Sequence, residues 1–387
     1  MVEDSMIYFD NAATTWPKPE CVYEAVDQCL RNKGANPSRS GHFMALLAGQ
    51  IVLNARVQIA EFFNISDPLQ VVFTPNATEA LNIGLKGLLK PGDHVITSSL
   101  EHNAVTRPLE KLRSQGVEVT KLPTPVQEGL HPEQVEAAIQ SNTKLIVLSH
   151  ASNVMGLIQP IGEIGRIAGE KGVLFMVDSA QTAGSIPIDV QAMGIDLLVF
   201  AGHKGLLGPQ GTGGLYLRED LRLDTLKEGG TGANSEEPFQ PEESPERYES
   251  GTLYTPGIAG LGAGIEFIKQ EGIEKIREKE RTLTRQLMLG LSAIPGVILY
   301  GPDPSVERAP VVSINLEGRE PSEVSYLLDK LYGIASRPGL HCAPDAHKTL
   351  GTFQQGTVRL SLGYFNTSQE VEECLDAVAG LSSPNKK

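Results

Sequence analysis

Short apolar runs alternate with amphipathic segments through the first half of the chain. Segments with helical spacing of apolar residues lie at 78–89, 132–140 and 161–170. This alternation predicts an α/β fold, in which helices cover both faces of a mostly parallel sheet and ligands bind at the carboxyl ends of the strands. The predicted strands lie at 71–74, 94–99, 117–122, 144–150, 173–178, 196–201 and 214–217.

The pattern changes in the second half of the chain. Residues 233–249 are rich in Glu, Pro and Ser without periodicity, which predicts a surface loop or linker. A helical pattern then extends from 257 to about 294, and a smaller α+β unit follows. Its predicted elements are strands at 311–316 and 358–362 and helices at 321–330 and 369–381, and residues 382–387 are expected to fray.

Length and composition narrow the class of protein. A chain of 387 residues is long enough for two domains, which we expect at 15–258 and at 259–387 together with 1–14. No apolar run approaches the ~18 residues that span a bilayer, and no signal-peptide pattern is present, so no membrane partner is expected. The formal charge of −14 argues against a nucleic-acid partner.

Four cysteines are present, at Cys21, Cys29, Cys342 and Cys374. Their spacing matches neither a disulfide framework nor a zinc site, so no metal is expected and a reducing cytoplasm is the simplest compartment. Cys21, Cys29 and Cys374 lie in helical patterns and are interpreted as packing residues.

Two polar residues follow predicted core strands. Asp178 ends the strand 173–178, and Lys204 follows the strand 196–201. A lysine in such a place loses hydration and can be a neutral amine, which is the form that makes a Schiff base. Each residue alone is more often a turn residue or a solvated side chain. Together they favour pyridoxal phosphate, which needs a lysine and a carboxylate near its ring nitrogen.

Residues 74–80 predict a strand-to-helix turn with small residues and the hydroxyl of Thr78. Free N–H groups and the helix dipole favour a phosphate there, although a plain N-cap gives the same pattern.

The segment 337–344 surrounds Cys342 with Arg, His, Pro and Gly, which is a poor setting for a core residue. Arg337 and His341 would favour its thiolate, the reactive form of cysteine. Arg359 follows shortly and can bind a substrate carboxylate through two nitrogens.

With these segments in place, the chain resembles class V aminotransferase-like enzymes that use pyridoxal phosphate. Within them it resembles the cysteine desulfurase and selenocysteine lyase branch with a compact cysteine loop. The resemblance extends from 8–14 to 359–367. It implies PLP fold type I, with a seven-stranded sheet in the large domain and a smaller α+β C-terminal domain, and a homodimer.

The resemblance also implies the role of each site residue. The phosphate would be bound by Ala77, Thr78 and His203, and by Thr252 from the other subunit. His102 would stack on the cofactor ring and move protons, because its ordinary pKa is near neutrality. Asn153 and Gln181 would contact the ring hydroxyl. The expected substrate-binding residues are Ala12, Asn153, Arg337 and Arg359.

The expected reaction converts L-cysteine to L-alanine and leaves a persulfide on Cys342. Lys204 would remove the α-proton, and Asp178 would keep the ring nitrogen protonated. A sulfur-acceptor protein is a further expected partner. The alternatives are a selenocysteine lyase, a transamination or β-elimination in which Cys342 is incidental, and a non-catalytic sulfur carrier or scaffold. Ala201, Leu253 and Tyr254 depart from the family pattern.

Overall fold

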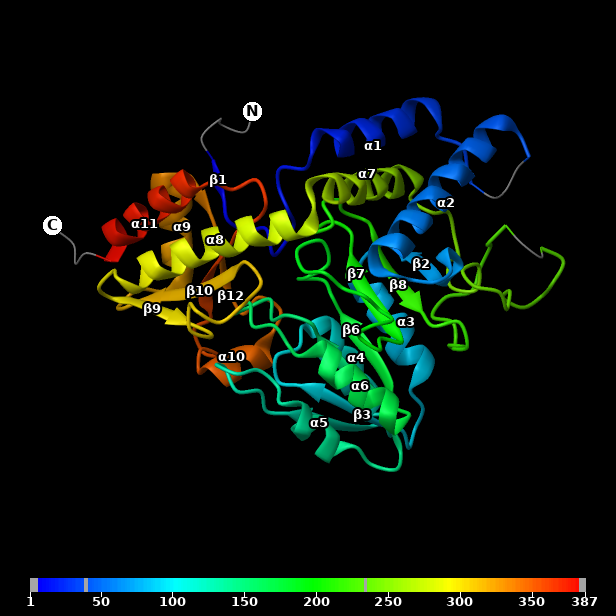
Figure 1. The fold of residues 1–387 in the computed structure, drawn as a ribbon, viewed down its shortest axis with the longest axis horizontal. Coiled ribbons are helices and arrows are strands. Elements are labelled where there is room, and N and C mark those ends of the chain that lie inside the picture. Colours follow the sequence, from blue (N-terminus) through cyan, green and yellow to red (C-terminus); the bar gives the residue numbers. More distant parts are fainter. Residues whose placement is uncertain (1–5, 38–40, 233–234, 383–387) are drawn as a thin grey trace.

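The computed structural model describes residues 6–37, 41–232 and 235–382, and its centre is a seven-stranded sheet (Figure 1). The strand order is β2-β8-β7-β6-β5-β3-β4, and β8 runs antiparallel to both of its neighbours. The other strands are parallel, so the predicted mostly parallel sheet is confirmed. The strands are β2 (Val71–Thr74), β3 (His94–Ser98), β4 (Glu118–Leu122), β5 (Thr143–Ser149), β6 (Leu174–Asp178), β7 (Leu197–Ala201) and β8 (Gly213–Leu217).

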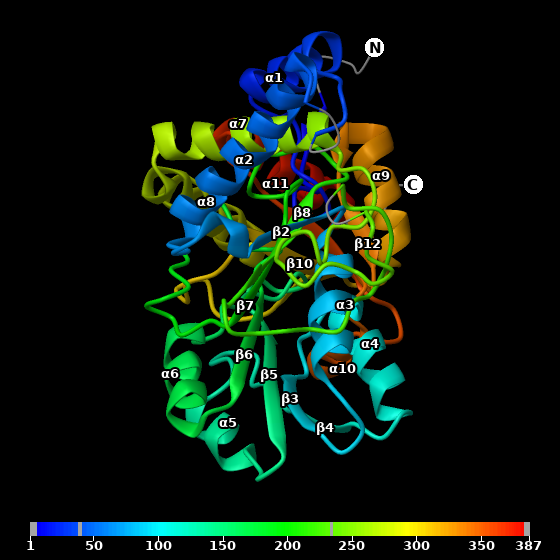
Figure 2. The ribbon, with the colours of Figure 1, turned by 90° about the vertical axis from the view of Figure 1, so that its right-hand side faces the viewer.

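Helices cover both faces of this sheet, because each central strand presents apolar side chains to both sides. Leu145 and Val147 of β5 pack on the face covered by α3 and α4, whereas Ile146 and Leu148 face α2, α5, α6 and α7. Figure 2 shows α3 and α4 on one side of the strands and α5 and α6 on the other. The helices of this part are α1 (Glu20–Asn32), α2 (Phe43–Phe63), α3 (Ala77–Leu88), α4 (Asn103–Arg113), α5 (Pro132–Ala138), α6 (Ile161–Lys171) and α7 (Thr255–Glu271), with a short 3₁₀ helix at Pro68–Gln70.

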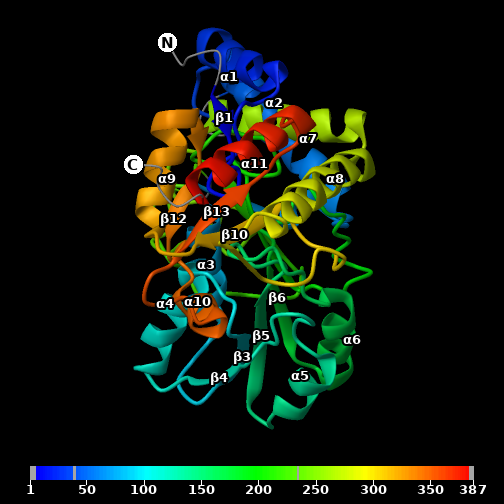
Figure 3. The same cartoon turned by 90° about the vertical axis from the view of Figure 1, so that its left-hand side faces the viewer.

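A second, antiparallel sheet has the order β12-β13-β10-β9 and its own hydrophobic core with α8, α9 and α11 (Figure 3). The N-terminal strand β1 (Ile7–Tyr8) pairs with β11 (Ile334–Ala335), which supports the proposal that 1–14 belong with the smaller domain. The remaining elements are α8 (Ile273–Ser292), β9 (Val297–Tyr300), β10 (Val311–Leu316), α9 (Pro321–Tyr332), β12 (Arg337–Gly339), α10 (Pro344–Leu350), β13 (Thr357–Ser361) and α11 (Ser368–Ser382).

The helical stretch expected from 257 to 294 is two helices. Gly272 separates α7 from α8 with φ +86°, a conformation that glycine adopts without strain. Ile258 of α7 belongs to the core of the large sheet, and Leu283 of α8 belongs to the second core. Ile276, near the start of α8, still belongs to the core of the large sheet, so the chain passes between the two cores within α8. The boundary proposed at 258/259 lies inside α7.

Residues 218–254 contain no helix or strand in the part that the structure describes, as expected for 235–249. The expectation of a surface loop is wrong at its end, however. Tyr248 is 5% exposed and the Glu249 side chain is 6% exposed. This loop is therefore anchored in the fold. Residues 233–234 and 383–387 lie outside the described residues.

Among the described residues, α2 is long and apolar enough to cross a membrane by length and composition, with 21 residues and a mean hydropathy of 1.4. The expectation that no apolar run reaches this length is therefore wrong. One side of α2, with Ile59 and Phe63, packs in the core of the large sheet. Phe43 and Leu46 on its other side are 73% and 62% exposed.

Candidate active site

The candidate site is a cavity of about 220 Å³ at the carboxyl ends of β5, β6 and β7, where an α/β sheet is expected to bind a ligand. Cys342 and Thr252 do not line it. The expected site residues that do are Ala12, Ala77, Thr78, His102, Asn153, Asp178, Gln181, His203, Lys204, Arg337 and Arg359. Sequence reasoning did not identify the lining residues Ala13, Asn76, Ala104, Ser149, Ala151 and Ala180, most of which are small and carry no chemical signal.

Asp178 and Lys204 reach this cavity from neighbouring strands. Asp178 ends β6 opposite Val199 of β7, and its Oδ1 accepts a hydrogen bond from the N–H of Ala180 at 3.0 Å. Burial raises the pKa of the Asp178 carboxyl, while the Ala180 N–H and Lys204 act in the opposite direction. Burial lowers the pKa of Lys204 to about 8, with Asp178 opposing the shift. Lys204 therefore loses its proton at a much lower pH than an ordinary lysine, and the neutral amine is the form that a nucleophile or base needs.

The turns that follow β6 and β7 contact each other at two glycines. Gly184 has φ +93°, and a Cβ there would lie 2.1 Å from the carbonyl oxygen of Gly205. A Cβ on Gly205 would lie 2.4 Å from the carbonyl oxygen of Ala183. Glycine has no side chain at either position, and this lets the turn that carries Lys204 pack directly on the turn that follows Asp178. A larger residue at either position would push the two turns apart.

The N-terminus of α3 forms another part of the cavity wall. Asn76 caps the helix, and its side chain accepts from the N–H of Glu79 at 2.9 Å. Ala77 and Thr78 begin the helix, where N–H groups lack partners within the helix and the dipole favours an anion. Nδ1 of His203 is buried with no partner among the described residues, and burial lowers the pKa of His203 to about 4. These groups fit a phosphate.

The carbonyl oxygen of His203 accepts several donors from the N-terminal segment. Thr14 Oγ1 and Thr15 N–H donate to it at 3.1 Å each, and Nζ of Lys18 donates at 2.7 Å. Burial lowers the pKa of Lys18 to about 7. These contacts fix the backbone directly before Lys204, and the sequence gives no signal for Lys18.

His102 is the N-cap of α4, and its Nδ1 accepts from the N–H of Ala104 at 3.0 Å. Its ring proton is therefore on Nε2. Burial lowers the pKa of His102 to about 4, and the charge of Lys204 adds to the shift. The expectation that His102 moves protons because its pKa is near neutrality is not supported, since the ring is neutral at pH 7.

Glu101 bonds to Ser149 of the cavity wall. Sequence reasoning does not identify it, because it follows a predicted strand as an ordinary polar loop residue beside His102. It is fully buried. Its Oε1 accepts from Ser98 Oγ at 2.5 Å, and its Oε2 accepts from the N–H and Oγ of Ser149 at 2.8 and 2.7 Å. Burial raises the pKa of Glu101 to about 7, and the charge of Asp178 adds to that shift.

Arg359 is 1% exposed and is bound on two sides. Its Nη2 donates to Oδ1 of Asp10 at 2.8 Å, and its Nη1 donates to the carbonyl oxygen of Asn153 at 3.1 Å. Its Nε has no partner among the described residues. The guanidinium thus retains donors for a substrate carboxylate, but Asp10 already binds one of its nitrogens. Sequence reasoning did not predict this role of Asp10.

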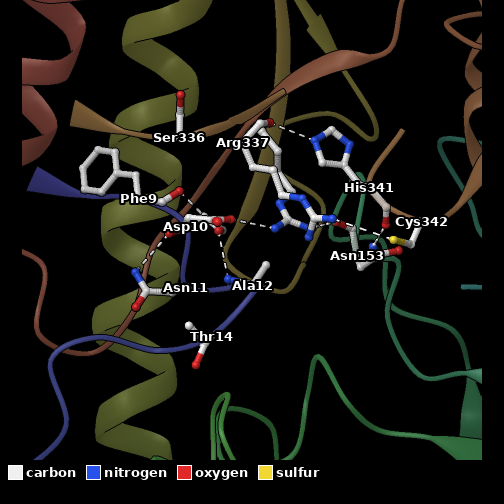
Figure 4. A network of polar contacts seen from close by, with 12 residues as sticks. Phe9, Asp10, Asn11, Ala12, Thr14, Asn153, Ser336, Arg337, His341 and Cys342 are labelled. Atoms are coloured by element: carbon white, nitrogen blue, oxygen red, sulfur yellow. Dashed lines mark hydrogen bonds and ion pairs between the residues drawn. The ribbon is translucent and has the colours of Figure 1, made fainter. Parts of the chain in front are cut away.

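Cys342 is exposed in the turn between β12 and α10, next to the cavity residues Arg337 and His341. His341 and Cys342 have φ values of +50° and +57°, a strained conformation for side chains of this size. Asn153 Nδ2 donates to the carbonyl oxygen of His341 at 2.7 Å (Figure 4). The N–H of Asn103 donates to the carbonyl oxygen of Cys342, also at 2.7 Å. These bonds hold the strained turn in place.

Charge near Cys342 comes from Arg337, whose Nη2 donates to the sulfur at 3.7 Å. The expectation that His341 also supplies charge is wrong. Burial and then Arg359 lower the pKa of His341 to about 3, so its ring is neutral. His341 Nε2 donates to the carbonyl oxygen of Arg337 at 2.9 Å, and its Nδ1 lies 3.2 Å from Nε2 of His347. His341 thus shapes the turn.

The other cysteines differ in exposure. Cys29 and Cys374 are buried, as expected, but Cys21 is exposed, so its interpretation as a packing residue is wrong. Burial raises the pKa of Cys21, and the carboxylates of Glu24 and Glu20 add to the shift. Exposure alone therefore does not distinguish Cys342 from Cys21. The neighbouring charge does, because Cys342 lies beside the cation of Arg337 and Cys21 lies near the carboxylates of Glu20 and Glu24.

Thr252 is exposed away from this cavity, and its Oγ1 accepts from Asn36 Nδ2 at 3.3 Å.

The residues that depart from the family pattern have local roles. Leu253 packs against the core of the large sheet, and Tyr254 precedes α7. Ala201 lines the cavity and brings no hydroxyl to it.

Comparisons with known proteins agree with this geometry. The model of the class-V aminotransferase family matches residues 7–374. A probable cysteine desulfurase from Methanothermobacter thermautotrophicus is 37% identical, over 97% of this chain and 95% of the relative. A cysteine desulfurase from Enterobacter is 34% identical, over 95% of this chain and 91% of the relative.

Solved structures give the same result. The apo structure of a cysteine desulfurase from Thermococcus onnurineus has a TM-score of 0.91 and 34% identity, and covers 98% of this chain and 97% of its own. A cysteine desulfurase from Escherichia coli, solved with an S-sulfonic acid, has a TM-score of 0.87 and 30% identity over 97% and 94%.

The chain belongs to the class-V aminotransferase family, whose members share this fold of a large α/β sheet and a smaller second unit. Within that family it belongs with the cysteine desulfurases, which are pyridoxal phosphate-dependent enzymes.

Proposed function

We propose that this protein is a cysteine desulfurase that converts L-cysteine to L-alanine and transfers the sulfur to Cys342. The substrate C–S bond breaks, an S–S bond forms to the Cys342 sulfur, and a proton replaces sulfur on the substrate carbon. The observation that carries the proposal is the strained turn that holds Cys342 beside the cavity of Lys204 and Asp178. Nη2 of Arg337 donates to the Cys342 sulfur, the atom that would attack the sulfur of the substrate.

The residues present fit pyridoxal phosphate. The α3 N-terminus with Thr78, and the unpartnered ring nitrogen of His203, would hold the phosphate. Asp178 would hold the proton of the ring nitrogen, and Lys204 would bind the aldehyde carbon. Among the other expected contacts, His102 is held with its proton on Nε2, and Gln181 Nε2 donates to the carbonyl oxygen of Ala12 at 3.2 Å. The bound cofactor would act as the electron sink for charge that develops on the substrate α-carbon.

The chain's own groups would do the remaining work. Arg359 binds the substrate carboxylate, and Arg337 lies at the cavity wall where it can assist. Lys204, with a pKa of about 8, takes the α-proton as a neutral amine and returns it as an ammonium. Asn153 holds the Cys342 turn beside the cavity through its bond to the carbonyl oxygen of His341.

We further propose a homodimer with shared sites. The exposed apolar side of α2, with Phe43, Leu46 and Leu53, is the kind of surface that a second copy of the chain would cover. Thr252 would then reach the cofactor phosphate of the partner. The cytoplasm as compartment and a sulfur-acceptor protein as partner belong to the same proposal.

The test is an assay of alanine release from L-cysteine and from L-selenocysteine, with wild type and Cys342→Ala. The proposal predicts that Cys342→Ala abolishes alanine release from cysteine, and Cys21→Ser is the control with the other exposed thiol. Activity on selenocysteine alone would favour the lyase. A cofactor that binds without alanine release would favour another class V reaction, and a protein that binds no cofactor would favour the scaffold.

A further inference from the structure

An ion pair between Arg56 of α2 and Glu249 of the 218–254 loop lies inside the protein. Each side chain is 6% exposed, and the Arg56 guanidinium carbon lies 4.6 Å from the centre of the Phe73 ring. Breaking a buried pair by removing one partner costs roughly 3–5 kcal/mol, because the other charge is left without compensation. A pair placed like this therefore fixes the segments that it joins.

The pair also binds the free edge of the large sheet. β2 is an edge strand, and the N–H and C=O groups of alternate residues along it point away from β8. Arg56 donates to the carbonyl oxygen of Val71, and the N–H of Phe73 donates to Oε1 of Glu249 at 2.5 Å. The two side chains thus bond to this edge as the backbone of a neighbouring strand would.

These bonds restrict where Thr252 can lie. Only Ser250 and Gly251 separate Glu249 from Thr252, and a chain of that length spans at most about 10 Å. Gly251 has φ +98°, which turns the chain there. The Thr252 hydroxyl accepts from Asn36, so it can donate its own proton to another group. A phosphate oxygen is such an acceptor.

We propose that Arg56 and Glu249 are positioning residues that hold the Thr252 hydroxyl in place for the cofactor phosphate of a second copy of the chain. This inference rests on the proposed shared site. It differs from a general role in stability, because the pair acts on the cofactor through Thr252. Once the pair is lost, the Thr252 hydroxyl should no longer contribute to cofactor binding.

The test is a double-mutant cycle on the affinity of the dimer for pyridoxal phosphate, measured by equilibrium dialysis. Glu249→Gln keeps an acceptor for Phe73 but removes the charge. Thr252→Val should weaken cofactor binding about 10-fold in the wild-type background, the scale of a hydrogen bond to a charged group. In the Glu249→Gln background it should weaken binding by less than about threefold, since coupled residues are not additive. Glu243→Gln, an exposed change in the same loop, should leave the full effect of Thr252→Val.

The outcomes separate the two proposals. The same roughly 10-fold effect in both backgrounds would overturn the positioning role and leave the shared site intact. No effect of Thr252→Val in the wild-type background would overturn the shared site, and the positioning role with it. If Glu249→Gln does not fold, the paired variant Arg56→Met with Glu249→Met removes both charges together. The effect of Thr252→Val on cofactor affinity is then compared between this background and wild type, with the same two outcomes.

Discussion

Oδ1 of Asp10 lies 2.8 Å from Nη2 of Arg359, although 349 positions separate the two residues in the chain. Asp10 follows β1, and Arg359 lies in β13 of the second sheet. A carboxylate of the protein therefore already binds the guanidinium that is proposed to hold the substrate carboxylate. The substrate must share this arginine with Asp10. The Asp10 carboxylate fixes the orientation of the guanidinium and offsets part of its positive charge.

Asp10→Asn should increase the affinity for a substrate carboxylate, because an amide can still orient Nη2 but no longer repels a second carboxylate. We expect L-alanine, the product, to inhibit Asp10→Asn several-fold more strongly than wild type. Asp10→Ala loses the orienting bond, so its inhibition by alanine should weaken. Equal inhibition constants for all three proteins would show that Asp10 does not act on the site.

Arg359→Lys should raise the KM for cysteine about 10-fold to 100-fold, because a point charge replaces two directed bonds to the carboxylate. The kcat should change much less. Steady-state kinetics separate the two effects, with Arg285→Lys, an exposed arginine on α8, as the control. A loss confined to kcat would contradict the binding role.

Lys204 in the cofactor-free protein should react with an amine reagent with a half-maximal rate near pH 8, its lowered pKa. Below that pH the folded protein keeps Lys204 protonated and unreactive, whereas an ordinary lysine needs a pH near 10.4. Competitive labelling read by peptide mass spectrometry measures this directly. After borohydride reduction of the loaded protein, the cofactor should be found on the Lys204 peptide, and its mapping to another lysine would refute the assignment.

Asp178→Asn should retain cofactor but lose turnover by more than about 100-fold, the lower scale for a positioned proton-handling group. A neutral amide cannot hold the proton of the ring nitrogen. Bound cofactor is measured by absorbance and turnover by alanine release. Near-normal turnover would reduce Asp178 to a structural residue at the end of β6.

Glu280→Gln should stabilise the protein at alkaline pH. Glu280 of α8 is 6% exposed, and its Oε2 has no hydrogen-bond partner among the described residues. Burial raises the pKa of Glu280 from 4.5 to about 7, so the native state holds a proton that the unfolded chain has lost. The contribution of Glu280 to the stability of the wild type is therefore lost as the pH rises from 4.5 through 7. The variant has no carboxyl at this position and does not lose it.

Thermal unfolding at two pH values checks this. At pH 8 the Tm of Glu280→Gln should exceed that of wild type by a few degrees, at roughly 2–4 °C per kcal/mol. Below pH 4.5 the difference should vanish, because the Glu280 carboxyl of the wild type is then protonated in both the folded and the unfolded state. Glu278→Gln, whose side chain is 60% exposed on the same helix, should show no such gain. A gain that is independent of pH would contradict the ionisation argument.

The parts of the site that the sequence predicts are those that lie at strand ends. Asp178 and Lys204 could be placed together because parallel neighbouring strands end at one edge of the sheet. The bonds from Asp10 to Arg359 and from Asn153 to the His341 carbonyl depend on how the second sheet packs on the first, which no local pattern encodes. The neutral state of His102 and His341 and the exposure of Cys21 also depend on burial, which is known only once the chain is folded.

The central claim is that sulfur passes from cysteine to Cys342, and peptide mapping after a single turnover tests it most directly. The loaded enzyme is mixed with less than one equivalent of L-cysteine, and its thiols and persulfides are then alkylated and identified by mass spectrometry. We predict one extra sulfur atom on the Cys342 peptide, in the same amount as the alanine released, and none on the Cys21 peptide. Alanine released with the extra sulfur on another cysteine, or on none, would contradict the mechanism.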